Sequence, residues 1–220
     1  QEQFNQLITK KNITLTYDPT IDRQHRYFYN HDNQLIAEQD AAGYLTEYVL
    51  DAGGRNLQTI HYAPQLSCTA TFDQLHDFLN QRTPEQKAKD GIYYHYYNAK
   101  NDLIFEIDPE KYLTQFDYHP YGKIKKQTRY ATQLTQIPSN GTPTPPHLDR
   151  EDQTIEYQHD LLFREIEVKY SNGLIESKSY DVMSNLLSDQ KHGLQDFNLL
   201  DGDHLRGTQT QWNAWNEAIR

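Results

Sequence analysis

The sequence lacks most of the features that identify a disulfide scaffold, a membrane span or a nucleic-acid surface. Its 220 residues include one cysteine, Cys68, so no internal disulfide framework exists. No apolar run approaches the ~20 residues of a membrane-spanning helix. Lysine and arginine number 21 against 31 aspartates and glutamates, which gives a net charge of -10. This acidic balance argues against nucleic acid as a partner, because phosphate binding requires a basic surface.

Catalytic motifs are also missing. The sequence contains no glycine-rich phosphate loop, no His-Glu-x-x-His and no Gly-x-Ser-x-Gly. Glu106 and Asp108 share a strand pattern, but surface roles are preferred for both. The stretch Asp201-Gly202-Asp203-His204 has oxygen donors at calcium-like spacing without the later acidic ligands, so an ordinary turn is preferred. We therefore expect no enzyme activity, no catalytic residue, no metal site and no cofactor.

Aromatic residues, in contrast, are abundant. The chain has 17 tyrosines, 8 phenylalanines and 2 tryptophans, whereas disordered chains are poor in such residues. A tyrosine packs its ring while its hydroxyl stays in water, so tyrosine supplements the apolar residues of a core. We expect an ordered protein.

The chain repeats itself. At one fixed offset, 26–66 aligns with 94–134 without a gap, and 15 of these 41 positions are identical. A looser third copy begins at Tyr157. The predicted copies are 26–63, 94–131, 157–190 and 212–220, and the insertions are 64–92 and 132–153. Because one repeat unit cannot bury an apolar face alone, we expect the repeats to pack side by side and form the fold together. We expect residues 1–220 to be a single repeat segment.

Turn signals divide each copy at short, even intervals. They are four-residue groups, mostly with Asx first and Gly or Asn last, at 30–33, 40–43, 51–54, 98–101, 108–111 and 119–122. Those residue types are preferred at the first and fourth positions of a type I turn, where the Asx side chain caps the turn. The segments between the turns alternate apolar and polar residues, and Asn172-Gly173 adds a further hairpin signal. The sequence therefore predicts an all-β array of antiparallel hairpins.

The two insertions differ in composition. In the first, Thr71 and Gln74 form a capping box, and a helical segment is expected at about 71–90 with Phe72, Leu75, Phe78 and Leu79 on its apolar face. The second contains Thr142-Pro143-Thr144-Pro145-Pro146 and is expected to be an extended, exposed loop.

Two aromatic stretches leave alternatives open. Around Tyr94 and Tyr96, exposed rings could hold sugars, or they could be cross-strand pairs that stabilise a sheet. Trp212 and Trp215 fit either an amphipathic helix or the start of a fourth copy, and the match to the repeat favours a strand. These four residues, Tyr94, Tyr96, Trp212 and Trp215, are the candidate glycan contacts.

The repeated unit resembles the Rhs or YD repeat. The first copy shows it as Tyr27-Phe28-Tyr29-Asn30 through Leu35, followed by Asp40 through Gly43, Thr46 and Tyr48. Tyr180-Asp181 is the dipeptide that gives the repeat its name. Departures from the pattern are Leu50 in place of Tyr, His119 in place of Asp and Lys111 in place of Gly.

The resemblance implies a bacterial Rhs polymorphic toxin, an insecticidal toxin complex or a teneurin-like protein. In these families the repeats form a curved sheet or partial shell around a C-terminal cargo, in large proteins that are exported or displayed on the cell surface. The implied partners are the rest of the array and an encapsulated toxin domain. The implied location is outside a bacterium, expected to be Gram-negative. The opening Gln1-Glu2-Gln3 suggests a piece of a longer protein, and the family's self-cleaving core is not visible.

Two functions follow as hypotheses. The preferred one is a non-enzymatic structural segment of an Rhs/YD-repeat shell. The alternative is a carbohydrate-binding or adhesive surface module, because such repeats have also been described as binding carbohydrate.

Overall fold

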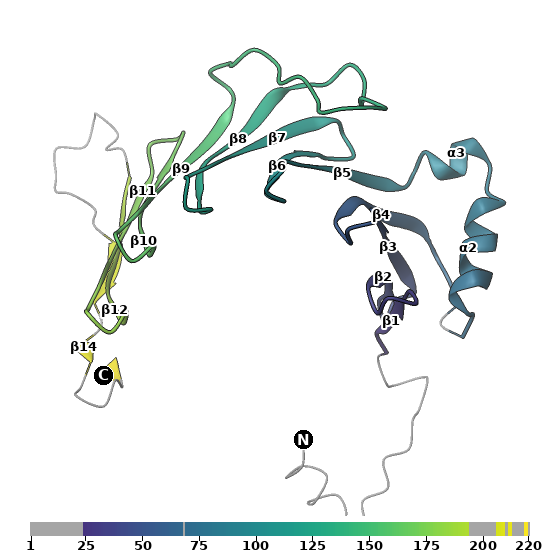
Figure 1. Cartoon of the computed structure of the whole chain (residues 1–220), viewed down its shortest axis with the longest axis horizontal. Coiled ribbons are helices and arrows are strands. Elements are labelled where there is room, and N and C mark those ends of the chain that lie inside the picture. The colour runs from purple at the N-terminus through teal and green to yellow at the C-terminus, as the bar shows by residue number, and fades with distance from the viewer. Residues whose placement is uncertain (1–23, 68, 194–205, 210, 213–217, 220) are drawn as a thin grey trace, which may run out of the picture. The chain divides into compact units, whose positions relative to one another are not determined.

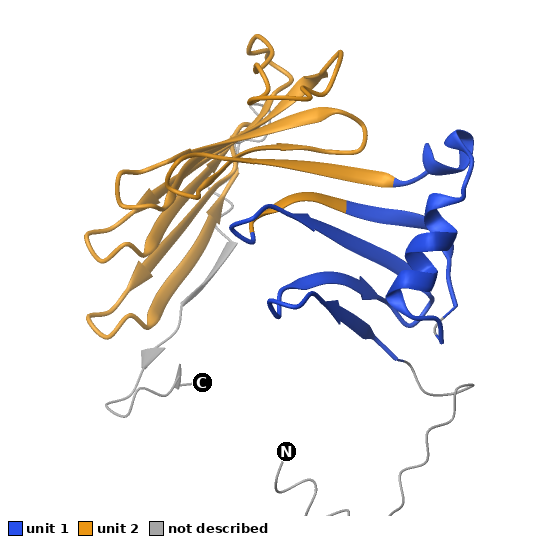
Figure 2. Ribbon diagram, turned by 45° about the vertical axis from the view of Figure 1, so that its right-hand side comes forward, with its two compact units in different colours: residues 1–54, 60–90 blue, residues 55–59, 91–220 orange. Residues whose placement is uncertain are grey.

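The structure is a computed structural model that describes residues 24–67, 69–193, 206–209, 211–212 and 218–219. The chain forms two compact units, coloured blue and orange in Figure 2. Unit 1 holds the described residues up to Gly54 together with Ile60–Asp90, and unit 2 holds Arg55–Thr59 and the described residues from Gly91 onward. Cys68 and 201–204 lie outside the described residues, as do 213–217, which include Trp215.

Unit 1 consists of antiparallel strands and two short helices (Figure 1). The elements are β1 (Arg26–Tyr29), β2 (Leu35–Gln39), β3 (Tyr44–Leu50), β4 (Asn56–Gln65), α2 (Phe72–Asn80) and α3 (Pro84–Lys87). Only the part of β4 from Ile60 on belongs to unit 1. Strand β2 pairs antiparallel with both β1 and β3.

Unit 2 continues the same pattern with more strands. These are β5 (Gly91–Tyr97), β6 (Leu103–Ile107), β7 (Tyr112–Tyr118), β8 (Ile124–Gln133), β9 (Gln153–His159), β10 (Glu165–Tyr170), β11 (Ile175–Tyr180), β12 (Leu186–His192) and β13 (Arg206–Gln209). From β6 on, each pairs antiparallel with the strand before it in sequence. Strands β14 (Gln211–Trp212) and β15 (Ala218–Ile219) form a separate antiparallel pair. The predicted all-β class with antiparallel hairpins and a short helical insertion is confirmed.

The first two copies have the same strand register. Tyr29 lies opposite Leu35, and Tyr97 lies opposite Leu103, with a bulge directly before each tyrosine. Gln39 pairs with Leu45 just as Ile107 pairs with Leu113 at the equivalent positions of the second copy. Residues that align in the sequence repeat therefore also occupy equivalent positions in the strand pairing of the two copies.

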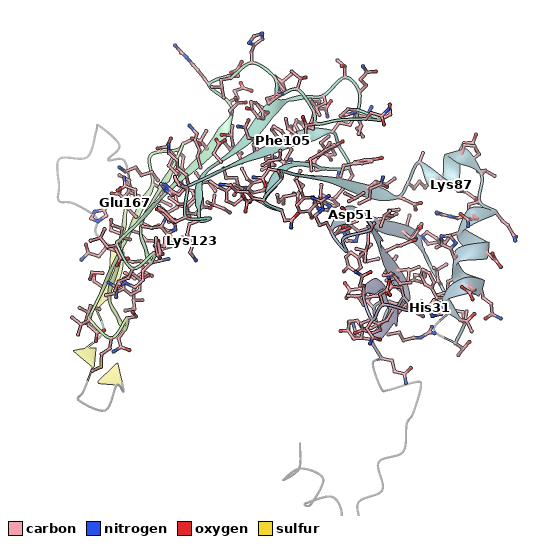
Figure 3. All side chains as sticks on the ribbon, viewed as in Figure 1. His31, Asp51, Lys87, Phe105, Lys123 and Glu167 are labelled. Atoms are coloured by element: carbon pink, nitrogen blue, oxygen red, sulfur yellow. The ribbon has the colours of Figure 1, made fainter. Side chains whose placement is uncertain are left out.

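Nine turns of one kind connect strands within the described residues. In each, the N–H of the fourth residue donates to the carbonyl of the first, and the fourth residue has a positive φ. This is a type I turn followed by a left-handed residue, which matches the twist of the flanking strands. The nine turns span 30–33, 40–43, 51–54, 98–101, 108–111, 119–122, 160–163, 170–173 and 181–184. Figure 3 labels His31 and Asp51 in two of them.

Each unit has its own small apolar core. In unit 1, Leu75 and Leu79 of α2 pack with Ala37, Leu45 and Leu66. In unit 2, the core cluster is Ile107, Leu113 and Tyr130, against which Phe105 packs. Leu45 and Leu113 are equivalent positions of the first two copies, so the repeat places its core residues as well as its turns.

The first insertion is helical, as predicted, and consists of two short helices. Helix α2 begins after the Thr71 capping box, and α3 has its own box at Thr83 with Pro84 in the first turn. Phe72 packs against the core, but Phe78 is half exposed, so the buried face is narrower than expected. In the second insertion, the expectation of full exposure was wrong for Pro143, which is buried.

The docking of α2 can be tested by truncating its most buried side chain. We expect Leu79→Ala to reduce the free energy of unfolding by about 2–5 kcal/mol, because Leu79 is almost fully buried and its removal leaves a cavity. The matched control Phe78→Ala, on the exposed side of the same helix, should cost no more than about 1 kcal/mol. Urea denaturation measures both. Equal costs would show that α2 does not dock through Leu79.

The turns can be tested at two glycines with similar φ values, 90° at Gly43 and 83° at Gly122. A methyl group on Gly43 would lie 2.7 Å from the Leu66 carbonyl oxygen, whereas nothing lies within 4 Å of one on Gly122. Gly122→Ala should therefore cost about 1–2 kcal/mol, the penalty for a left-handed alanine alone. Gly43→Ala should cost clearly more in the same denaturation assay. A larger loss for Gly122→Ala would contradict this turn geometry.

Candidate functional site

The turns have a common chemistry at their first residue. In seven of the nine, an Asp or Asn side-chain oxygen accepts the N–H of the residue two positions later, at 2.8–3.0 Å. In six of these, the same oxygen also accepts the N–H four positions later. These contacts satisfy main-chain donors that the strand ladder does not reach. The aspartate of the Tyr-Asp dipeptide is thus a structural cap.

Two caps show this role in their acidity. The main-chain N–H of Arg164 is the largest cause of the lowered pKa of Asp160, and the Arg164 guanidinium lowers it further. The Asn185 side chain is the main cause of the lowered pKa of Asp181. Both carboxylates therefore stay charged and accept hydrogen bonds at neutral pH.

The tyrosine of the dipeptide anchors its turn to the neighbouring strand. The hydroxyl of Tyr118 donates to the carbonyl of Leu103 at 2.8 Å, and that of Tyr180 donates to the carbonyl of Glu165 at 3.0 Å. These two bonds are equivalent in the second and third copies. In the first copy Leu50 stands at this position, so the bond cannot form there.

His119 replaces the capping Asp in its turn and begins an aromatic cluster. Its ring stacks on Tyr121, with centroids 4.7 Å apart and planes 8° apart. His159, from the end of β9, meets the His119 ring edge-on at 5.7 Å. Phe163 of the next turn lies 4.8 Å from Tyr121. We call His119, Tyr121, His159 and Phe163 the rim cluster, because all four lie at or beside turns on one edge of unit 2.

The rim cluster contains two unusual polar atoms. Nε2 of His119 and Nδ1 of His159 are buried and have no hydrogen-bond partner among the described residues. Burial is the main cause of the lowered pKa of His159, and the nearby His119 adds to it. The cluster borders an open hollow of about 500 Å³, whose lining includes Tyr157, His159 and Glu165.

The rim cluster supports ring packing and, at His159, proton uptake. Within the described ranges, no group of three or more His, Cys, Asp or Glu side chains is placed to hold a metal ion. Glu165 is committed to an ion pair with Lys178 at 2.6 Å. Glu106 faces His95 at 3.4 Å, while Asp108 caps its turn and pairs with Arg129, so the two carboxylates do not act together.

A second device, which the sequence interpretation missed, closes both insertions. The carboxylate of Asp90 accepts the N–H of Ala63 at 3.0 Å, and that of Asp152 accepts the N–H of Ala131 at 2.8 Å. Ala63 and Ala131 are equivalent, and each aspartate directly precedes the next strand. Asp90 also binds Arg82 through two hydrogen bonds. The sequence does contain a signal for this contact, because an Asp stands directly before the strand that follows each insertion. The two insertions differ in length, so Asp90 and Asp152 do not align at the fixed offset of the repeat.

The candidate glycan residues are not displayed as a set by the described part of the chain. Tyr94 and Tyr96 lie on one face of β5 and pack, half-buried, against the core cluster of unit 2. Burial raises the pKa of Tyr96. Trp212 belongs to strand β14, but its side chain and all of Trp215 are outside the described residues. Their role as glycan contacts stays a prediction.

Comparisons with known proteins show the fold. No family model and no curated protein sequence matches the chain. The crystal structure of TcdB2-TccC3-TEV matches with a TM-score of 0.57 and 11% identity, over 89% of this chain and 9% of that chain. The Photorhabdus luminescens Tc holotoxin pore matches with a TM-score of 0.55 and 13% identity, over 89% of this chain and 8% of that one. The crystal structure of TcdB2-TccC3 matches with a TM-score of 0.56 and 13% identity, over 89% of this chain and 9% of that chain.

These matches indicate that the chain has the fold of a small part of such toxin chains, since it spans only about a tenth of their length. No helix within the described ranges is long and apolar enough to cross a membrane.

We expect the rim cluster to make stability depend on pH. Because the folded pKa of His159 is lowered, the unfolded chain takes up this proton first as pH falls below about 6.5. The stabilisation is present above that pH and is lost as pH falls through the folded pKa. We expect His159→Gln to reduce the loss of stability between about pH 7 and pH 5.

Urea denaturation at several pH values measures this dependence. The control is His31→Gln, an exposed histidine in a turn of unit 1, which should keep the slope of the parent chain. A His159→Gln slope equal to that of the parent would contradict the prediction.

Proposed function

We propose that this chain is a non-enzymatic structural segment of an Rhs/YD-repeat β-shell in a large, exported, toxin-like bacterial protein. The observation that carries the proposal is the series of nine turns with one hydrogen-bond pattern, joined by antiparallel strands in sequence order. The fold likeness to TcdB2-TccC3 over 89% of the chain supports it.

The roles of the polar side chains also support a structural function. Asp and Asn residues cap turns, Tyr118 and Tyr180 bind main-chain carbonyls, and Asp90 and Asp152 close insertions. These groups are committed to holding the backbone, as a wall requires. The carbohydrate-binding alternative lacks comparable support, because Tyr94 and Tyr96 pack against a core cluster.

In the proposed setting, the partners are the rest of the repeat array and an enclosed toxin domain. The polypeptide would be secreted by, or displayed on, a bacterium of the Gram-negative type. The wall would act by geometry, since hairpins paired in one register extend a sheet without a break.

The proposal is tested by imaging the polypeptide that carries this sequence, purified from its source. Electron microscopy should show a closed hollow particle with the sheet as its wall. Insertion of one residue after Ser177, within β11, should open the particle, because a one-residue shift turns every later side chain of that strand to the other face.

The matched control is the same insertion after Asn140, in the loop between β8 and β9, which should leave the particle closed. A filament, a solid globule, or a particle unchanged by the insertion after Ser177 would contradict the proposal.

A further inference from the structure

Three neighbouring turns of unit 2 carry large apolar side chains that are exposed. Leu161 is 96% exposed, Val182 94% and Met183 70%. Leu162, Phe163 and Tyr121 are each between about two-fifths and three-fifths exposed. We call these six residues the apolar rim. They include Tyr121 and Phe163 of the rim cluster, which contact each other and so join two of the three turns.

The turn conformation does not require these side chains. At the second and third positions, six other turns of the same kind hold His-Asp, Ala-Ala, Ala-Gly, Ala-Lys, Pro-Glu and Ser-Asn. All nine turns share the same main-chain hydrogen bond. The pairs Leu161-Leu162 and Val182-Met183 therefore serve something other than the turn itself.

The topology places the apolar rim along one edge of the sheet. The turns at 119–122, 160–163 and 181–184 connect β7 to β8, β9 to β10 and β11 to β12, and alternate turns of an antiparallel array lie on the same edge. Neighbouring tips are therefore two strands apart, or about 10 Å. The opposite edge of this region holds the polar turns at 108–111 and 170–173 and the loop between β8 and β9.

The apolar rim is also large and locally neutral. At roughly 200 Å² for a large side chain, the six residues together expose on the order of 800 Å² over the three tips. The three turns and the residue after each carry two positive charges, Lys123 and Arg164, and two negative charges, Asp160 and Asp181. The whole chain, in contrast, has a net charge of -10.

We propose that the apolar rim is an interface for a second copy of this chain. An area of about 800 Å² per partner is that of a standard stable interface. Two chains of net charge -10 repel each other. The repulsion is weakest at the apolar rim, where positive and negative charges are equal in number, so two copies approach each other through this surface. Tips spaced about 10 Å apart leave gaps of the same spacing, and a second rim offset by half a spacing fills them in a two-fold, self-complementary contact.

This inference goes beyond the proposed function and does not depend on it. A lipid surface is the competing partner for exposed apolar tips, yet a net charge of -10 opposes approach to the anionic lipids that hold peripheral proteins. Pairing of strand edges is another route to self-association, but it would use main-chain groups and leave the apolar rim exposed.

The test is sedimentation equilibrium of the full chain over a concentration series. The parent chain should form a dimer. The fourfold variant Leu161→Ser, Leu162→Ser, Val182→Ser and Met183→Ser should weaken the dimer by about tenfold or more, because it removes the centre of the interface. The control Leu148→Ser changes an exposed leucine away from the rim and should leave the dimer unchanged. Circular dichroism confirms that both variants fold.

Four results would overturn the proposal. They are a parent chain that stays monomeric throughout the series, a fourfold variant that associates as strongly as the parent, an equal weakening by Leu148→Ser, and binding of the monomer to vesicles of zwitterionic or anionic lipid with no dimer. If the fourfold variant does not fold, the double variant Val182→Ser and Met183→Ser, confined to one turn tip, replaces it with a smaller expected loss.

Discussion

The structure depends on one local arrangement, the turn whose first residue caps its own backbone and whose fourth residue has a positive φ. An Asp or Asn oxygen accepts one or two main-chain N–H groups at seven of the nine turns. That contact sets where a strand ends and where the next begins, and so it sets the register of the hairpins that these turns close. Because the turns recur at short, even intervals outside the two insertions, successive strands within each unit pair antiparallel.

The other features build on this arrangement. Tyrosine hydroxyls fasten the turns to neighbouring strands, and small clusters around Leu45 and Leu113 bury one face. Insertions are tolerated where Asp90 and Asp152 hold the ends of the interrupted strands together. A chain with 36% hydrophobic residues can thus form the strands of both units, because main-chain pairing and tyrosine packing supplement its modest cores.

The sequence predicted the fold well because the decisive signals are local. The repeat offset, the Asx-led turns and the Thr71 capping box each specify structure over short stretches of chain. What the sequence did not predict depends on contacts between distant residues. The pairing of Asp90 with Ala63 spans 27 residues, and the rim cluster joins His119 to His159 only because β8 and β9 bring two turns side by side. The exposure of Leu161 and Val182 was also not predicted, because the turns at 160–163 and 181–184 were not recognised in the sequence.

The central claim, that all nine turns share one backbone conformation, is tested most directly where the residue type disfavours it. Chemical shifts from a backbone NMR assignment report φ at Lys111, Phe163 and Ser184, which are neither glycine nor asparagine. We expect positive φ values at all three, near 61–69°. Negative values at these positions would contradict the claim, because the turns and the strand register they impose would then differ from copy to copy.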